Sequence, residues 1–145
     1  MSVRSLQHYR VQVEEQLKME LAEVTQHLLQ AEQSCARLTD DQSQQEARYR
    51  EETSRGLTIE QLLQWQSHFE AQAAAMEQAR RTMAHWQTQW DEVRVRVVSA
   101  SQDRRTLDRL IARYREAAAT EERRREQSAT DESAHHRYIG QGDQP

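Results

Sequence analysis

Residues 54–69 read SRGLTIEQLLQWQSHF, and this stretch decides the fold. Gly56 is the only glycine before Gly140, and glycine readily adopts the left-handed conformation that ends a helix. Thr58 and Gln61 have the spacing of a capping box, in which each side chain bonds the backbone of the other residue at the start of a helix. The stretch therefore predicts that one helix ends near Gly56 and that a second helix begins at Thr58.

The hydrophobic residues around this turn support the same interpretation. Leu57 and Leu62 have the spacing of a hydrophobic staple, which fixes the direction in which the chain enters a helix. A connection this short brings two long helices side by side in opposite directions. The turn thus predicts an antiparallel helical hairpin.

The second helix carries the longest apolar pattern in the chain. Seventeen positions follow one another at alternating spacings of three and four residues, and only Gln72 and Arg104 among them are polar. This spacing predicts a coiled-coil seam that packs against a partner helix. The positions are Leu62, Trp65, Phe69, Gln72, Met76, Ala79, Met83, Trp86, Trp90, Val93, Val97, Ala100, Arg104, Leu107, Ile111, Tyr114 and Ala118.

The first helix carries a shorter seam of the same kind. Upstream, Tyr9 and Val13 extend it with spacings of four residues, which interrupts the heptad as a stutter does. Downstream, Gln42 and Gln45 occupy the seam before Tyr49, so the seam is weak there. Its regular part consists of Leu17, Leu21, Val24, Leu28, Ala31, Cys35 and Leu38.

We therefore expect an all-α fold, in which two long helices form an antiparallel coiled-coil hairpin over residues 1–136. The first helix is expected at about 5–54, the turn at 55–57 and the second helix at about 58–130. Residues 137–145 are expected to form a flexible tail.

The position of the turn also predicts which residues of the two helices face each other. Folding the chain about the glycine of the turn places Leu21 opposite Trp90, and Leu28 opposite Met83 and Trp86. Large side chains then meet smaller ones, as close packing requires.

The composition excludes several classes of protein. The net charge is −4 with both signs interspersed, which argues against a nucleic-acid-binding face. No apolar run approaches the roughly 20 residues that span a bilayer, and the amino terminus has no signal-peptide core. The single cysteine, Cys35, excludes an internal disulfide and lies on the apolar seam, where a buried core residue is expected. We therefore expect a cytoplasmic protein.

The sequence offers no recognisable reaction chemistry. Three isolated glycines cannot form a phosphate-binding loop, and the six histidines show no metal-ligand spacing. A two-helix hairpin has no pocket that would exclude water from its carboxylates. We predict no catalytic residues, no cofactor and no metal site, and a protein that is not an enzyme.

Two parts of the second helix lack apolar partners in the first helix. Near the turn, Trp65 and Phe69 face the polar run 41–46, unless a bend lets Tyr49 cover Trp65. Unpaired apolar stripes of this kind often mark interaction surfaces.

The second such part is the far end of the same helix. Residues beyond about Asp108 have nothing opposite them, so Leu110, Ile111 and Tyr114 are left unpaired. Val3 and Leu6 of the amino terminus could cover this stripe, or it could pair with a second copy of the chain.

The chain resembles the flagellar export protein FliJ family, from about Tyr9 to His136. The similarity lies in the order of several short segments along a hairpin with a glycine-containing turn. The segments are Arg48-Tyr49-Arg50-Glu51, the aromatic residues that end at Phe69, Met76-Glu77-Gln78, the Trp86 and Trp90 region, and Asp131-Glu132-Ser133-Ala134.

The resemblance implies a non-enzymatic component of the flagellar type III export apparatus, cytoplasmic and held at the inner face of the membrane only through its partners. Such a protein is a monomer that binds the export ATPase ring as a central stalk, contacts the export gate and escorts export chaperones. The alternatives are the equivalent stalk of an injectisome and a self-associating structural coiled coil.

Two sets of residues are expected to make these contacts. Trp65, Phe69 and Met76 are expected to bind the gate or chaperones. The set expected to bind the ATPase comprises Leu6, Arg10, Leu107, Leu110, Ile111 and Tyr114.

Overall fold

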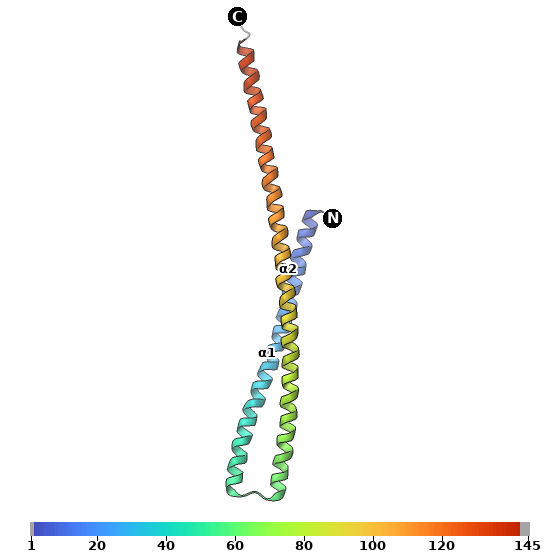
Figure 1. Cartoon of the computed structure of the whole chain (residues 1–145), viewed down its shortest axis with the longest axis vertical. Coiled ribbons are helices and arrows are strands. Elements are labelled where there is room, and N and C mark those ends of the chain that lie inside the picture. The colour runs from blue at the N-terminus through green and yellow to red at the C-terminus, as the bar shows by residue number, and fades with distance from the viewer. Residues whose placement is uncertain (1, 143–145) are drawn as a thin grey trace. The chain divides into compact units, whose positions relative to one another are not determined.

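The computed structural model describes residues 2–142, which form two helices (Figure 1). Helix α1 spans Val3–Arg55 and helix α2 spans Ile59–Gly142. The described residues contain no strand. The predicted all-α fold with two long helices in a hairpin is confirmed.

Helix α1 begins at a serine cap that the sequence analysis did not use. The backbone N–H of Ser5 donates to Ser2 Oγ at 3.1 Å, and the N–H of Leu6 donates to the Ser2 carbonyl at 3.1 Å. A serine side chain at this position satisfies a backbone donor that the helix itself leaves unpaired. The helix therefore starts at Val3, slightly before the expected residue 5.

The turn has the geometry that its sequence predicts. Gly56 has φ of +94°, and its N–H donates to the Thr53 carbonyl at 3.1 Å. The capping box is confirmed, because the Thr58 N–H donates to Gln61 Oε1 at 3.1 Å and the Gln61 N–H donates to Thr58 Oγ1 at 3.2 Å. These contacts close α1 and start α2 within three residues.

Helix α2 continues to Gly142 instead of ending near residue 130 as expected. Nothing between the turn and Gly140 breaks a helix, and Glu121 lies 3.8 Å from Arg124 and 3.7 Å from Arg125, which supports this part of α2. Residues 137–142 of the predicted tail are thus helical, and residues 143–145 lie outside the described part of the chain. The flexibility of the tail stays a prediction.

The chain divides into two compact units. The hairpin unit is Val13–Ala100, and the terminal unit combines Met1–Gln12 with Ser101–Pro145. Within the hairpin unit, α1 and α2 lie side by side (Figure 1).

The predicted seam forms the core of the hairpin unit. Every predicted α2 seam position from Trp65 to Ala100 is buried or half-buried, and so is every α1 position from Leu17 to Leu38. Val93 is the most enclosed hydrophobic side chain, with 1% of its surface exposed. Removing these apolar groups from water is the main favourable contribution to folding of the unit.

The register between the helices differs from the expected one. Trp90 Nε1 donates to Thr25 Oγ1 at 3.0 Å, although it was expected opposite Leu21. The ring of Trp86 stacks on His27, with the centroids 4.3 Å apart. The shift arises because α1 ends at Arg55 and α2 begins at Ile59, so the midpoint of the turn is Leu57 and not the glycine.

Candidate functional site

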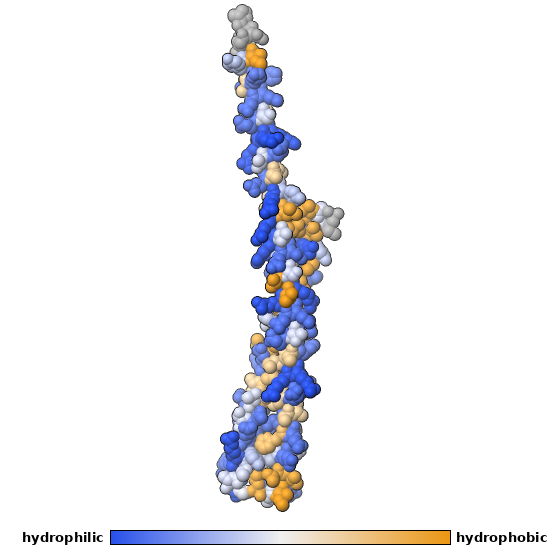
Figure 2. Space-filling view, viewed as in Figure 1, coloured by the Kyte–Doolittle hydropathy of each residue, from blue (hydrophilic) through white to orange (hydrophobic). Residues whose placement is uncertain are grey.

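An apolar groove lies near the turn of the hairpin unit. It has a volume of about 530 Å³. We call it the turn groove, and it is lined by Tyr49, Leu62, Trp65, Gln66, Phe69, Glu70 and Ala73. Figure 2 shows apolar residues gathered at this end, over the first turns of α2.

Three aromatic rings form the floor of the turn groove. The Tyr49 ring meets Trp65 edge-on at 5.7 Å and Phe69 edge-on at 5.3 Å, while Trp65 and Phe69 stack at 5.5 Å. Aromatic pairs favour these arrangements. Tyr49 thus covers Trp65, which is the alternative that the sequence left open, and it also contacts Phe69. Gln45 of the polar run 41–46 lies beside Trp65 as well, so the ring faces both Tyr49 and part of that run. All three aromatic residues remain half-buried, so they are still accessible from the groove.

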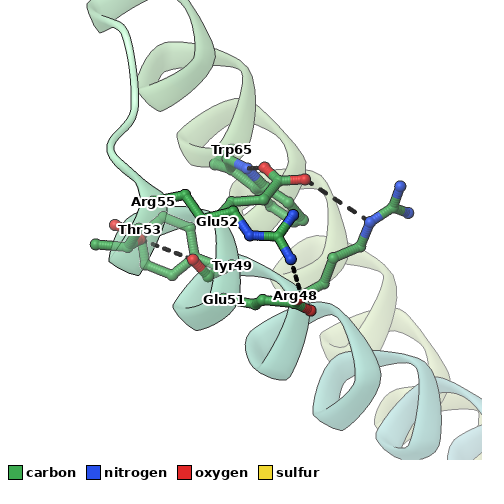
Figure 3. Close-up of polar contacts among 7 residues, drawn as sticks. All are labelled: Arg48, Tyr49, Glu51, Glu52, Thr53, Arg55 and Trp65. Carbon is green, nitrogen blue, oxygen red and sulfur yellow. Dashed lines mark hydrogen bonds and ion pairs between the residues drawn. The ribbon is translucent and has the colours of Figure 1, made fainter.

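The polar edge of Trp65 is held by α1 (Figure 3). The indole Nε1–H donates to Glu52 Oε2 at 2.7 Å, and Arg48 Nε lies 3.8 Å from Glu52 Oε1. The Thr53 hydroxyl donates to the Tyr49 carbonyl at 2.7 Å in the same part of α1. With its N–H satisfied on one side, the indole ring presents its apolar surface to the groove.

Glu52 was missed by the sequence analysis, although a signal for it exists. It follows Tyr49 by three residues, which is the next position of the α1 seam. A search restricted to apolar residues does not find a carboxylate in that position.

The apolar surface extends beyond the groove toward the turn. Ile59, Leu62 and Leu63 are exposed by 79%, 46% and 58%. Only Leu62 was identified from the sequence, because Ile59 and Leu63 lie beside the seam and not on it. Apolar side chains exposed next to one another in this way are typical of interaction surfaces.

Met76 is placed differently from the other two residues expected to bind the gate or chaperones. It is buried in the seam, with 8% of its surface exposed, and does not line the turn groove. Trp65 and Phe69 do line it. The structure thus brings two of the three predicted residues together at one surface.

The residues expected to bind the ATPase all lie in the terminal unit. Leu6, Leu107 and Ile111 are half-buried, whereas Leu110 and Tyr114 are exposed by 43% and 63%. Figure 2 shows apolar surface beside the amino-terminal end of α1. Every side chain of α2 from residue 112 to residue 140 is exposed.

Polar contacts join α1 to α2 in the terminal unit. Arg10 Nη1 lies 3.3 Å from Asp103 Oδ2, and Gln7 Nε2 donates to Asp108 Oδ1 at 3.0 Å. Asp108 therefore has a partner on α1, and the half-burial of Ile111 shows that the stripe beyond it is partly covered. The sequence predicted that α2 residues beyond about Asp108 have no partner in α1. This prediction agrees with the exposure of Leu110 and Tyr114 but not with the half-burial of Ile111.

The amino-terminal part of the α1 seam is polar, which the sequence analysis did not predict. Glu14 is 2% exposed and its carboxylate lies 3.0 Å from Lys18 Nζ. Tyr9, which was expected on the seam, is 53% exposed. Continuing the spacing of three and four residues upstream of Leu17 gives Glu14, then Arg10, so the heptad continues and the expected stutter is wrong.

Within the described residues, the structure contains neither a candidate membrane span nor a candidate metal site. Neither helix contains a segment long and apolar enough to cross a membrane. No group of three or more histidine, cysteine, aspartate or glutamate side chains is placed to hold a metal ion in the part of the chain that the structure describes.

The model of the family described as "Flagellar FliJ protein" matches residues 2–143, nearly the whole chain. No curated protein and no solved structure matches the chain. The resemblance that the short segments predicted is thereby confirmed, and the chain belongs to the flagellar FliJ protein family.

Proposed function

We propose that the chain is a non-enzymatic stalk component of the flagellar type III export apparatus. It binds the export ATPase ring through the terminal unit, and it binds the export gate and export chaperones through the turn groove. Family membership supports a role in flagellar protein export. The binding of each partner is our proposal.

The observation that carries the proposal is the exposure of apolar seam residues in each of the two units. In the hairpin unit, the aromatic floor of the turn groove remains open and Leu62 is 46% exposed. In the terminal unit, Tyr114 continues the seam spacing but is 63% exposed. A seam residue without a partner in its own chain can bury its surface against a second protein.

The terminal unit has features suited to an ATPase ring. The predicted contact Leu110 lies just before residues 112–140 of α2, whose side chains are all exposed, and Tyr114 lies within them. A single exposed helix can enter a ring without being unpacked from its own chain. The same unit contains Leu6 and Arg10 of α1 and Leu107 and Ile111 of α2, which are half-buried, and we assign them to the same contact.

The turn groove has features suited to the gate or a chaperone. Trp65 and Phe69 are aromatic, half-buried and held in place by Tyr49. Large preorganised aromatic residues commonly contribute most to binding energy at protein interfaces. Met76 lies one heptad after Phe69 on the seam and is buried, so we assign it a supporting role and no direct contact with the partner.

We propose a cytoplasmic monomer that reaches the inner face of the membrane only through its partners. The matched family is described as flagellar, which favours the flagellar system over an injectisome. The same exposed Leu110 and Tyr114 would also serve a self-associating coiled coil, so the oligomeric state separates these two functions.

Size-exclusion chromatography with light scattering tests the proposal, on the chain alone and mixed with the export ATPase of the same organism. We expect a mass near 17.1 kDa for the chain alone at every concentration. With the ATPase, we expect co-elution with an enlarged ATPase oligomer. A stable dimer that does not bind the ATPase would contradict the proposal and indicate self-association.

A further inference from the structure

We propose that the turn groove receives a basic amphipathic helix, and that Glu70 on its rim selects for the positive charge of that helix. The assignment of the groove to a partner of the export apparatus rests on the proposed function. The chemistry of the occupant is inferred from the groove itself, through its shape, the backbone around it and its charge.

The spacing of the lining residues suits a helix. Leu62, Gln66, Phe69 and Ala73 are separated by four, three and four residues, so they form one face of α2 over about 16 Å. Tyr49 is the lining residue that α1 contributes. Ala73 is small, which allows another helix to approach α2 closely at that end. A partner helix lying along this face can insert side chains at spacings of three, four and seven residues.

The backbone around the groove favours a helix over an extended peptide. A peptide that binds as an added β-strand gains affinity from main-chain hydrogen bonds to the edge of a sheet. The described residues form helix from Val3 to Arg55 and from Ile59 to Gly142, and they offer no sheet edge. A helix satisfies its own backbone hydrogen bonds and needs only side-chain contacts.

The charge around the groove favours a basic partner. Residues 40–77 contain eight carboxylates and three arginines, a net charge of −5, while the remaining residues carry a net charge of +1. The turn end of the hairpin unit is therefore more acidic than the chain as a whole. Complementary charge between two surfaces speeds association and excludes partners of the wrong sign.

Glu70 is the carboxylate best placed to bind a positively charged side chain of the partner helix. It lines the groove, it is exposed, and it forms no ion pair with any residue that the structure describes. Glu52, by contrast, already accepts the Trp65 N–H and faces Arg48. An unpaired rim carboxylate beside an apolar floor can bind a lysine or arginine next to the apolar face of a helix.

Two designed helical peptides of about 18 residues test this inference. They share one leucine face and differ only in carrying lysine or glutamate on the polar face. Fluorescence anisotropy of the labelled peptides at about 0.15 M salt gives their affinities. We expect the lysine peptide to bind the full chain at least about tenfold more tightly than the glutamate peptide.

Three variants show where the lysine peptide binds. Phe69→Ala should weaken its binding about tenfold or more, because the aromatic floor is lost. Glu70→Gln should weaken it about threefold to tenfold. Glu32→Gln makes the same change of charge at an exposed carboxylate of α1 that does not line the groove, and it should leave the affinity unchanged.

Equal affinity of the chain for the two peptides would overturn the inference. Equal losses of lysine-peptide affinity in Glu70→Gln and Glu32→Gln would also overturn it, because they would indicate unspecific adsorption to an acidic surface. A lysine peptide that ignores Phe69→Ala would overturn it as well. Failure of the proposed function would give a different result. The lysine peptide would still bind the groove, but Phe69→Ala would not change the binding of the export gate and chaperones of the same organism to the chain.

Discussion

Trp65 is fixed by two contacts of different character. Its ring packs against Tyr49 and Phe69, while its N–H donates to the half-buried carboxylate of Glu52 at 2.7 Å. The ring contacts supply the apolar surface of the turn groove, and the hydrogen bond sets the direction in which the indole faces. A binding surface that depends on one aromatic ring therefore also depends on a carboxylate behind it.

We expect Glu52→Ala to lower the free energy of unfolding by about 1 kcal/mol, because it leaves the Trp65 N–H without its acceptor. Glu52→Gln should cost less, since its amide oxygen can still accept. Urea unfolding followed by circular dichroism measures the difference. The control is Glu51→Ala, which removes only an exposed ion pair with Arg55 and should cost about 0.5 kcal/mol or less. Equal losses for Glu51→Ala and Glu52→Ala would show that the hydrogen bond contributes nothing.

At the scale of the helices, the seam positions could be predicted from the sequence where they are apolar and evenly spaced. The α2 seam was predictable from Trp65 to Ile111 because almost all of its positions are apolar and the spacing never changes. The amino-terminal part of the α1 seam was not predictable, because its positions are occupied by the charged residues Glu14 and Arg10. The aromatic floor of the turn groove was predicted in part, through Trp65 and Phe69, with Tyr49 as a possible cover for Trp65. The contact of Tyr49 with Phe69 was not predicted, because it depends on the register between the helices.

The end of α2 shows the opposite failure of prediction. The second helix was expected to end near residue 130, yet it continues to Gly142. Charges of both signs at spacings of three and four residues support a helix locally, whether or not a partner helix is present. The absence of an apolar seam after Ala118 indicates a helix without a partner and does not indicate its end.

Two valines of α2 test whether the seam supplies the stability of the hairpin unit. Val93 is 1% exposed and Val95 is 68% exposed. We expect Val93→Ala to lower the free energy of unfolding by about 2 kcal/mol, because two buried methyl groups are removed and a cavity remains. Val95→Ala makes the identical chemical change on the exposed surface and should change stability by less than about 0.5 kcal/mol. Comparable losses at both positions in urea unfolding would argue against a two-helix seam.

At the scale of the whole molecule, the two candidate surfaces belong to different units and use different residues. The turn groove lies in the hairpin unit, and the exposed Leu110 and Tyr114 lie in the terminal unit. Substitutions in separate surfaces with no shared partners usually have independent effects. A protein that links an ATPase to a gate or chaperone requires this independence, because both partners must be able to bind one copy of the chain.

We therefore expect the two binding activities to be separable by substitution. Tyr114→Ala should weaken binding to the export ATPase about tenfold and leave gate and chaperone binding unchanged, whereas Trp65→Ala should do the reverse. Met19→Ala removes a 71% exposed apolar side chain of α1 from outside both proposed surfaces, and it serves as the control for both. Isothermal titration with each partner gives the affinities, and circular dichroism checks that helicity is retained. If either variant weakened both interactions at unchanged helicity, the two partners would share one surface, and a stalk that holds both at once would be ruled out.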